Sequence, residues 1–267
     1  MIRLIATDLD GTLLERDGTL PEDTFEVIRM LNTRGIRFAA ASGRQYGNLV
    51  RLFAPVADLM AFVCENGAYC MVNGQEAGTI AIARDVAEEI IADLQKLDMN
   101  LLISGKHTCY MLDQNRKYTD DIVYRLRNTV TIVSDIKDIK EPILKVSGQI
   151  DTGVASLAPA LIEKWGSMVT ATVSGRDWFD FTVANKGMGM EKLMQHMGLQ
   201  KEEVAALGDN FNDETMLDLV GHPFIMETAH PALHKSGYHK CHKVIPVLKA
   251  IVQANGDLEQ ALTQLNG

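Results

Sequence analysis

Largely apolar runs recur in the first third of the chain and predict three buried strands. The runs cover residues 2–7, 36–42 and 60–64 and show no polar alternation, which is typical of strands covered on both faces. Two segments with the apolar spacing of helices lie between these runs. The first begins at Pro21, and the second covers residues 46–53. The order strand, helix, strand, helix, strand predicts a parallel sheet with helices on both faces.

The rhythm changes after the third strand. Asn73 and Gly74 lie between two strand-like segments, and this dipeptide is a strong hairpin signal. From about residue 84 to 183 the pattern reads helix, strand, strand three times over, which indicates an α+β unit with its own sheet. Strand patterns then resume in "EVAALGDNFND" and "GHPFIME". We predict an α/β fold: a Rossmann-like, doubly wound parallel core at residues 1–82 and 185–267, with an inserted α+β domain at residues 83–184.

Composition narrows the classes of partner. The chain has 267 residues with a formal net charge of −9 and no basic cluster, which argues against nucleic acid and anionic membranes as partners. No apolar stretch approaches the roughly 20 residues of a membrane helix, and the opening "MIRLIATDLDG" turns acidic too early for a signal peptide. The four cysteines show neither close pairing nor zinc spacing. We expect buried thiols and a cytoplasmic protein.

Acidic side chains gather where predicted strands end. Asp8 and Asp10 close the first strand, and residues two apart in a strand point the same way. Gly11 then permits a turn away from the sheet. Asp209 and Asp213 follow the strand "VAALG". Because ligands of open parallel sheets bind beyond the carboxyl ends of the strands, we expect these carboxylates to share one site.

Such crowding calls for a cation. Two like charges about 4 Å apart repel by about 4 kcal/mol at an effective dielectric near 20. Hard carboxylate oxygens with room for water suit Mg²⁺, and neither histidine nor cysteine lies beside them to indicate zinc. A helix cap or turn is the simpler explanation for Asp213 alone. For the pair Asp8 and Asp10 it is weak, since no turn requires both.

A phosphate ester would complete a site with Mg²⁺. Ser42 offers a hydroxyl, and Gly43 offers an unhindered backbone N–H where the second strand gives way to a helix. Lys186 begins a helix after the insertion and supplies positive charge. Cations are disfavoured at helix N-termini, so this lysine favours a functional role over a solvated surface one.

These motifs resemble those of the haloacid dehalogenase superfamily of phosphatases, in the Cof-type subfamily (class IIB) with a large inserted α/β cap. Four signatures match in order, and "ENGA" at 65–68 agrees with the same subfamily. The signatures are "DLDGTL" at 8–13, "ASGR" at 41–44, Lys186 in "NKGMGM" and "GDNFND" at 208–213. The resemblance covers the whole chain and implies a HAD-like core.

The resemblance implies roles for these residues. Asp8 is then the nucleophile that forms an aspartyl-phosphate, and Asp10 is the general acid and base. The Asp8 side chain, the Asp10 carbonyl and Asp209 would hold Mg²⁺. The phosphoryl group would be bound by Leu9, Ser42, Gly43, Lys186 and Asn212. Thr12, Arg44, Asn66 and Asp213 are candidates for support or substrate contact, with Asp213 orienting Lys186 or a metal-bound water.

Two stretches leave alternatives open. A tract at residues 230–242, dense in histidine, departs from the family pattern; it would be either a second metal site or an exposed loop and helix, and we favour the latter. Cations of the insertion would bind an anionic or sugar substrate or would simply be solvated; they are Lys106, His107, Arg116, Lys117, Arg125 and Arg127.

The resemblance implies a Mg²⁺-dependent phosphatase of small phosphorylated metabolites. Sugar phosphates are the first candidates, followed by flavin mononucleotide and pyridoxal phosphate. The alternatives are a phosphomutase or phosphotransferase with the same intermediate, a phospho-aspartate signalling module, and a binding protein with a dead site. The signalling module is disfavoured by length and by Asp10, and the dead site by the complete motif set. We expect a monomer or homodimer without nucleic-acid or membrane partners.

Overall fold

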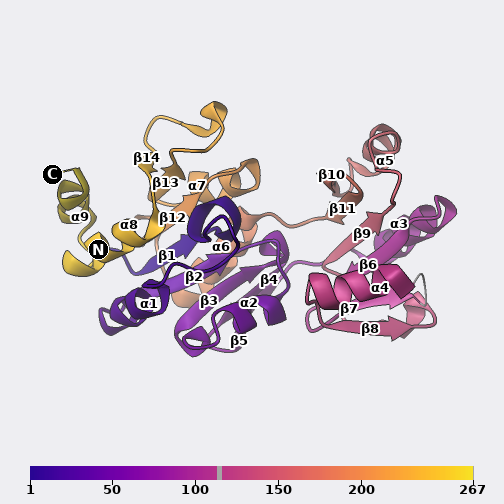
Figure 1. The fold of residues 1–267 in the computed structure, drawn as a ribbon, viewed down its shortest axis with the longest axis horizontal. Helices are drawn as coiled ribbons and strands as arrows, with labels where there is room; N and C mark the ends of the chain where they lie inside the picture. The colour runs from indigo at the N-terminus through magenta and orange to yellow at the C-terminus, as the bar shows by residue number, and fades with distance from the viewer. Residues whose placement is uncertain (113–115, 267) are drawn as a thin grey trace. The chain divides into compact units, whose positions relative to one another are not determined.

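The chain folds into two compact units (Figure 1). The computed structural model describes residues 1–112 and 116–266. The core unit comprises Met1–Arg44, Leu49–Gly78 and Asn185–Gly267. The inserted unit comprises Gln45–Asn48 and Thr79–Ala184. The action of the inserted unit as a cap stays a prediction.

The core unit is built on a sheet whose strand order within the described residues is β14-β13-β12-β1-β2-β3-β4-β5. Its strands from β14 to β3 run parallel, and β4 runs antiparallel to β3. Figure 1 shows the indigo β1 beside the orange β12, although almost 200 residues separate them. The strands are β1 (Leu4–Thr7), β2 (Arg37–Ala41), β3 (Met60–Cys64), β4 (Tyr69–Val72), β5 (Gln75–Thr79), β12 (Val204–Gly208), β13 (His222–Met226) and β14 (His239–Cys241).

Helices cover both faces of this sheet. Alternate strand residues such as Ala39 and Val63 pack against Met190 of α6 and Leu217 of α7 in one apolar cluster. On the other face α1 packs against β2 and α8. Each fully buried aliphatic side chain stabilises this arrangement by roughly 1.5–3 kcal/mol. The helices are α1 (Thr24–Thr33), α2 (Tyr46–Leu52), α6 (Lys186–Met197), α7 (Glu214–Leu219), α8 (Val244–Gln253) and α9 (Leu258–Asn266).

The inserted unit has a mostly antiparallel sheet, with the order β10-β11-β9-β6-β7-β8 in the described residues. Leu101 and Ile103 face a cluster with α3 and α5, whereas Leu102 faces α4 and the following turn. The elements are α3 (Arg84–Lys96), β6 (Asn100–Ser104), β7 (Cys109–Leu112), α4 (Arg116–Asp120), β8 (Val130–Val133), β9 (Lys145–Gln149), α5 (Ala158–Trp165), β10 (Thr170–Gly175) and β11 (Trp178–Thr182). The predicted fold class, a doubly wound α/β core with an inserted α+β unit, is confirmed.

Two local predictions are wrong. Helix α1 begins at Thr24 and not at Pro21, because Pro21 and the two residues after it form a turn in which the Thr24 N–H donates to the Pro21 carbonyl at 3.0 Å. The histidine-rich tract is not only loop and helix, because His239–Cys241 adds the edge strand β14 beside β13. Edge strands this short carry little hydrophobic pattern, so the sequence signal is weak.

The cysteines are buried, as the sequence predicts. Cys64, Cys70, Cys109 and Cys241, all among the described residues, are buried free thiols. Across residues 1–112 and 116–266, no helix has the length and apolar character required to cross a bilayer.

Candidate active site

The predicted acidic residues meet where the core sheet changes winding direction. From the central strand β1 the chain proceeds through β2 and β3 on one side, while β12 and β13 lie on the other. Thr7 is in register with Leu207, and the N–H of Asp8 donates to the Leu207 carbonyl at 2.9 Å. Asp8 and Asp209 therefore leave neighbouring parallel strands at the same edge, where open α/β sheets bind their ligands.

Lys186 lies fully buried between two of these carboxylates. Its Nζ is 2.5 Å from Asp8 Oδ1 and 2.5 Å from Asp213 Oδ1, and its side chain is 0% exposed. Lys186 is the first residue of α6, and the side chain of Asn185 caps that helix by accepting from the Met188 N–H. The two ion pairs hold a cation at a helix N-terminus, where the helix dipole alone would oppose it.

The pKa values of both Asp8 and Lys186 are raised above their ordinary values. Burial raises the pKa of Asp8 to about 7, despite the opposing charge of Lys186, and the neighbouring charges of Asp213 and Asp209 add to the rise. Burial opposes the charge of Lys186, but the two carboxylates outweigh it and raise its pKa. Lys186 is therefore charged, and a further cation beside Asp8 would favour the ionised form of its carboxyl group.

The acidic cluster fits a divalent cation. Carboxylate oxygens of Asp8, Asp209 and Asp213 lie within 4.8 Å of one another, the one such cluster in the described part of the chain. Three carboxylates against the single ammonium of Lys186 leave two negative charges to be balanced. Asp213 is already engaged, because its Oδ2 accepts from the N–H groups of Asp209 and Asn210 at 3.0 Å each. Asp8 and Asp209 are therefore the carboxylates that suit a hard cation such as Mg²⁺.

Close approach of backbone and carboxylates depends on two glycines. Gly11 has φ +93°, and a Cβ there would lie 2.4 Å from Asp209 Oδ2. A Cβ on Gly208 would lie 2.6 Å from the Cβ of Asp213. Thr12, in the same turn as Gly11, donates its hydroxyl to Asp209 Oδ1 at 2.6 Å. Small residues thus bring the β1 and β12 loops into hydrogen-bond contact.

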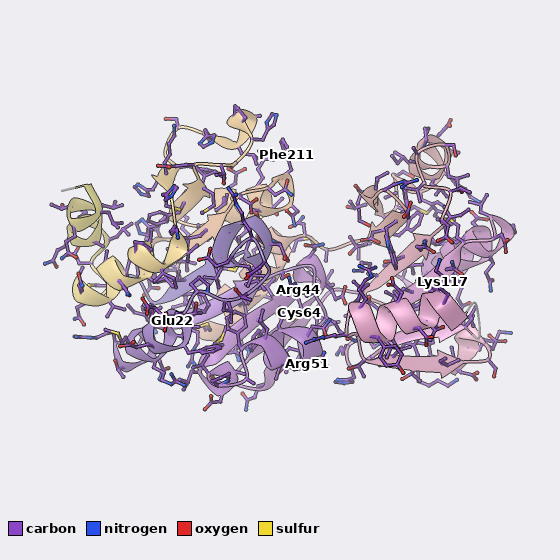
Figure 2. The ribbon with its side chains drawn as sticks, in the orientation of Figure 1. Glu22, Arg44, Arg51, Cys64, Lys117 and Phe211 are labelled. Atoms are coloured by element: carbon purple, nitrogen blue, oxygen red, sulfur yellow. The ribbon has the colours of Figure 1, made fainter. Side chains whose placement is uncertain are left out.

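Asp10 and Arg44 form a separate, more exposed pair. The guanidinium donates from Nη2 to Asp10 Oδ1 at 2.6 Å and from Nε to Asp10 Oδ2 at 3.2 Å. The Asp10 side chain is 63% exposed, and that of Arg44 is 36% exposed. Figure 2 labels Arg44 in the core unit. The sequence points to both residues but not to their pairing, which fixes the direction of the Asp10 carboxylate.

The remaining predicted residues lie on the β1, β2 and β3 loops and beside α7. Ser42 is buried, and its Oγ accepts from the Arg44 N–H at 3.3 Å. Asn66 approaches Gly43 so closely that a Cβ there would lie 3.1 Å from Asn66 Nδ2. Asn212 donates to Asn66 Oδ1 at 3.3 Å.

Leu9 is a buried residue in the first turn after β1. Its carbonyl accepts from the Leu14 N–H at 2.8 Å and so closes that turn. The predicted contacts of Leu9, Ser42, Gly43, Lys186 and Asn212 with a phosphoryl group stay predictions.

Sequence reasoning missed the supports of α6. Gly67 has φ +102°, and a Cβ there would lie 2.0 Å from the carbonyl oxygen of Asn185. Thr215 accepts from the Gly187 N–H at 3.1 Å. The asparagine directly before Lys186 was a usable signal, because asparagine is a preferred N-cap. The contacts of Gly67 and Thr215 join distant segments and leave no local pattern.

The histidine-rich tract does not form a metal-ligating group among the residues that the structure describes. His230 accepts from the Ala232 N–H, and the His234 ring contacts the Ala229 carbonyl. His242 faces Glu227, and the ring of His239 packs against Phe224. These contacts give the four histidines separate structural partners.

Comparison with known proteins places this site in a family. A model of the haloacid dehalogenase-like hydrolases matches residues 5–244. The 5-amino-6-(5-phospho-D-ribitylamino)uracil phosphatase YbjI of Escherichia coli (strain K12) is 26% identical over 272 residues, which cover 97% of this chain and 99% of that protein. The residues matched by the family model include all the motifs at the strand ends.

Solved structures agree on the fold. A crystal structure of a Eubacterium rectale protein has a TM-score of 0.83 at 22% identity and covers 98% of both chains. The HAD subclass IIB sugar phosphatase BT4131 has a TM-score of 0.72 at 20% identity and covers 99% of both chains. Both comparisons include the inserted unit as well as the core.

Proposed function

The chain belongs to the haloacid dehalogenase-like hydrolase family and is a phosphoric monoester hydrolase, and from this premise we propose that it cleaves small phosphorylated metabolites through a phosphorylated Asp8. The observation that carries the proposal is the placement of Asp8 at the sheet's switch point, 2.5 Å from a buried lysine. A carboxylate held beside a fixed cation is positioned to attack an electron-poor phosphorus.

The proposed reaction has two steps. First, an Asp8 oxygen bonds to phosphorus, the bond from phosphorus to the ester oxygen breaks, and Asp10 gives its proton to the leaving oxygen. Second, water gives a proton to Asp10 while its oxygen attacks phosphorus, the bond to Asp8 breaks, and inorganic phosphate leaves. Arg44 holds the Asp10 carboxylate by two hydrogen bonds and thereby orients the acid and base.

Mg²⁺ would be held by the Asp8 carboxylate, the Asp10 carbonyl and Asp209, and it would supply positive charge to the phosphoryl oxygens. Thr12 fixes Asp209 through its hydroxyl. Asp213 orients Lys186, whose ammonium neutralises charge beside the nucleophile. Ser42 and Gly43 would bind phosphoryl oxygens together with the Leu9 N–H and Asn212.

We propose sugar phosphates as the first substrate class, ahead of flavin mononucleotide and pyridoxal phosphate. Support comes from the relatives: one is named for a phosphorylated ribityl compound and one for sugar phosphates. Residues 83–184 would act as a cap that admits small esters only. The same proposal includes a cytoplasmic location, supported by four buried free thiols, and a monomer or homodimer.

Phosphate release from p-nitrophenyl phosphate tests the proposal. We expect turnover with Mg²⁺, loss with EDTA and recovery when Mg²⁺ is added in excess. Acid quenching during turnover, followed by mass spectrometry of the Asp8 peptide, should show a phosphoryl group on Asp8. Turnover that is unaffected by EDTA, or a phosphoryl group on another residue, would contradict the mechanism. If added sugars take up the phosphoryl group in place of water, the enzyme is a phosphotransferase.

A further inference from the structure

The inserted unit contains a pocket of about 350 Å³ that the proposed chemistry does not use. It lies at one end of the sheet, where the last residue of β9, Gln149, is in register with the first residues of β6 and β11, Asn100 and Trp178. The chain enters and leaves the unit at the opposite end of these strands, beyond Ile82 and Thr182. The lining residues are Asn100, Lys117, Tyr118, Asp121, Arg125, Gln149, Asp151, Asp177 and Trp178.

Two polar atoms of residues that line this pocket have no hydrogen-bond partner among residues 1–112 and 116–266. The hydroxyl of Tyr118 is buried and unpartnered, and the residue as a whole is only 6% exposed. Asp177 Oδ1 is also buried without a hydrogen-bond partner, although Arg176 Nε lies 3.6 Å from it. Buried polar groups are almost always satisfied, so a donor and an acceptor left open at one pocket point to a ligand that completes them.

Other side chains are already oriented. Asn100 Nδ2 donates to Gln149 Oε1 at 2.7 Å, and Gln149 Nε2 donates to Asp151 Oδ1 at 2.9 Å. This chain of bonds fixes one carboxylate at the rim. Arg125 donates to both oxygens of Asp121, so its charge is neutralised within the protein. Lys117 is a residue of α4 (Figure 2).

The chemistry of the lining selects a class of ligand. Three carboxylates face two cations of the lining, and Arg176 beside Asp177 adds a third. The pocket therefore has no excess of positive charge to attract phosphate or other anions. Hydroxyl groups accept from a phenol and donate to a carboxylate, so a molecule with several hydroxyl groups satisfies both Tyr118 and Asp177. The half-buried ring of Trp178, whose centroid is 5.9 Å from that of Tyr118, offers an apolar surface to C–H groups.

We propose that this pocket binds a neutral polyhydroxylated molecule of monosaccharide size, such as a pentitol or a sugar. Its volume lies at the lower end of the range for small-molecule sites. The site rests on the geometry of the inserted unit and not on the proposed phosphatase mechanism. The polyhydroxyl group comes either from the carbon skeleton of a phosphorylated substrate or from a free polyol.

Titration of the full-length protein with ribitol and with glucose tests the site. The ¹H–¹⁵N spectrum should show a shift of the Trp178 indole resonance, and Tyr118→Phe should weaken binding about tenfold, because it removes one hydrogen bond and little volume. Tyr124→Phe is the control: Tyr124 is 75% exposed and does not line the pocket, so affinity should stay at the wild-type value. The Asp177→Asn variant should also lose affinity.

Several outcomes would overturn the proposal. One is the absence of a Trp178 shift with both polyols; another is wild-type affinity in Tyr118→Phe. A third is displacement of the polyol by inorganic phosphate, which would mean an anion site. The KM for ribitol 5-phosphate distinguishes a phosphorylated substrate from a free polyol as the ligand. If the KM rises in Tyr118→Phe, the pocket binds the substrate. If the KM is unchanged while ribitol binding is lost, the pocket binds a free polyol. Failure of the Asp8 mechanism would leave these binding results unaffected.

Discussion

The acidic site of the core unit and the pocket of the inserted unit differ in whether their buried polar groups have partners within the protein. In the core, Lys186 has no exposed surface and contacts Asp8 and Asp213 at 2.5 Å each. In the inserted unit, the Tyr118 hydroxyl and Asp177 Oδ1 are buried and have no hydrogen-bond partner in the described part of the chain. In the first arrangement the protein itself supplies the cation that pairs with the carboxylates, whereas in the second we propose that a ligand supplies the missing hydrogen-bond partners.

This difference follows from what each site has to do. Phosphoryl transfer depends on groups that are held in place before the substrate arrives, so the protein itself provides most partners of Asp8, Lys186 and Asp213. A recognition pocket gains selectivity when the ligand satisfies groups that are otherwise unsatisfied. The parallel core sheet and the mostly antiparallel inserted sheet would thus carry different kinds of site.

The largest effect is expected from Asp8→Asn. An amide oxygen is a poor nucleophile for phosphorus, so kcat for p-nitrophenyl phosphate should fall by at least about 10⁴-fold. The fold should persist, because asparagine has the same shape and removes one of three clustered negative charges. The control is Asp93→Asn in α3, whose carboxylate pairs with the exposed lysines Lys96 and Lys164. Wild-type turnover in Asp8→Asn would mean that another residue is the nucleophile.

The second-largest effect is a loss of stability, which should be greater when a buried lysine is replaced than when an exposed lysine is replaced. Lys186→Met leaves the carboxylates of Asp8 and Asp213 without their cation, so the free energy of unfolding should fall by roughly 3–5 kcal/mol. Lys164→Met in the inserted unit breaks an exposed pair with Asp93 and should cost at most about 1 kcal/mol. Urea titrations of both variants measure the contrast. Equal losses would contradict the view that the core network is held by buried charge.

The meeting of Asp8, Asp209 and Asp213 in the core could be predicted because it follows from local patterns. Asp8 and Asp10 directly follow an apolar run, and Asp209 and Asp213 follow another, so strand ends and charges coincide. Parallel topology then brings those ends together without further information. The strands and helices of the inserted unit were also recognisable in order from their apolar spacing.

What could not be predicted depends on contacts between distant segments. The pairing of Arg44 with Asp10, and that of Asn212 with Asn66, requires side-chain geometry. The pocket lining comes from several strands, a helix and loops, and no local pattern marks it. Strand β14 has three residues in a polar tract, and its register is set by β13 and not by its own periodicity.

The smallest effect is expected from Arg44→Lys. The guanidinium bonds to both oxygens of Asp10 in a planar fork, at 2.6 and 3.2 Å, and an ammonium cannot reproduce that geometry. Charge is kept, so phosphate binding should change little, while the Asp10 carboxylate loses its fixed direction. We expect kcat to fall about threefold to tenfold with KM nearly unchanged.

Arg51→Lys on α2 provides the matched control for this change, and it should leave both constants at wild-type values. Poor leaving groups should show the larger loss in Arg44→Lys, because protonation of the leaving oxygen then limits the first step. A rise in KM with unchanged kcat would instead assign Arg44 to substrate binding. In that case the partner of Arg44 during turnover would be the substrate, as we propose for Tyr118 and Asp177 in the inserted unit. The core site and the pocket would then not differ in this respect.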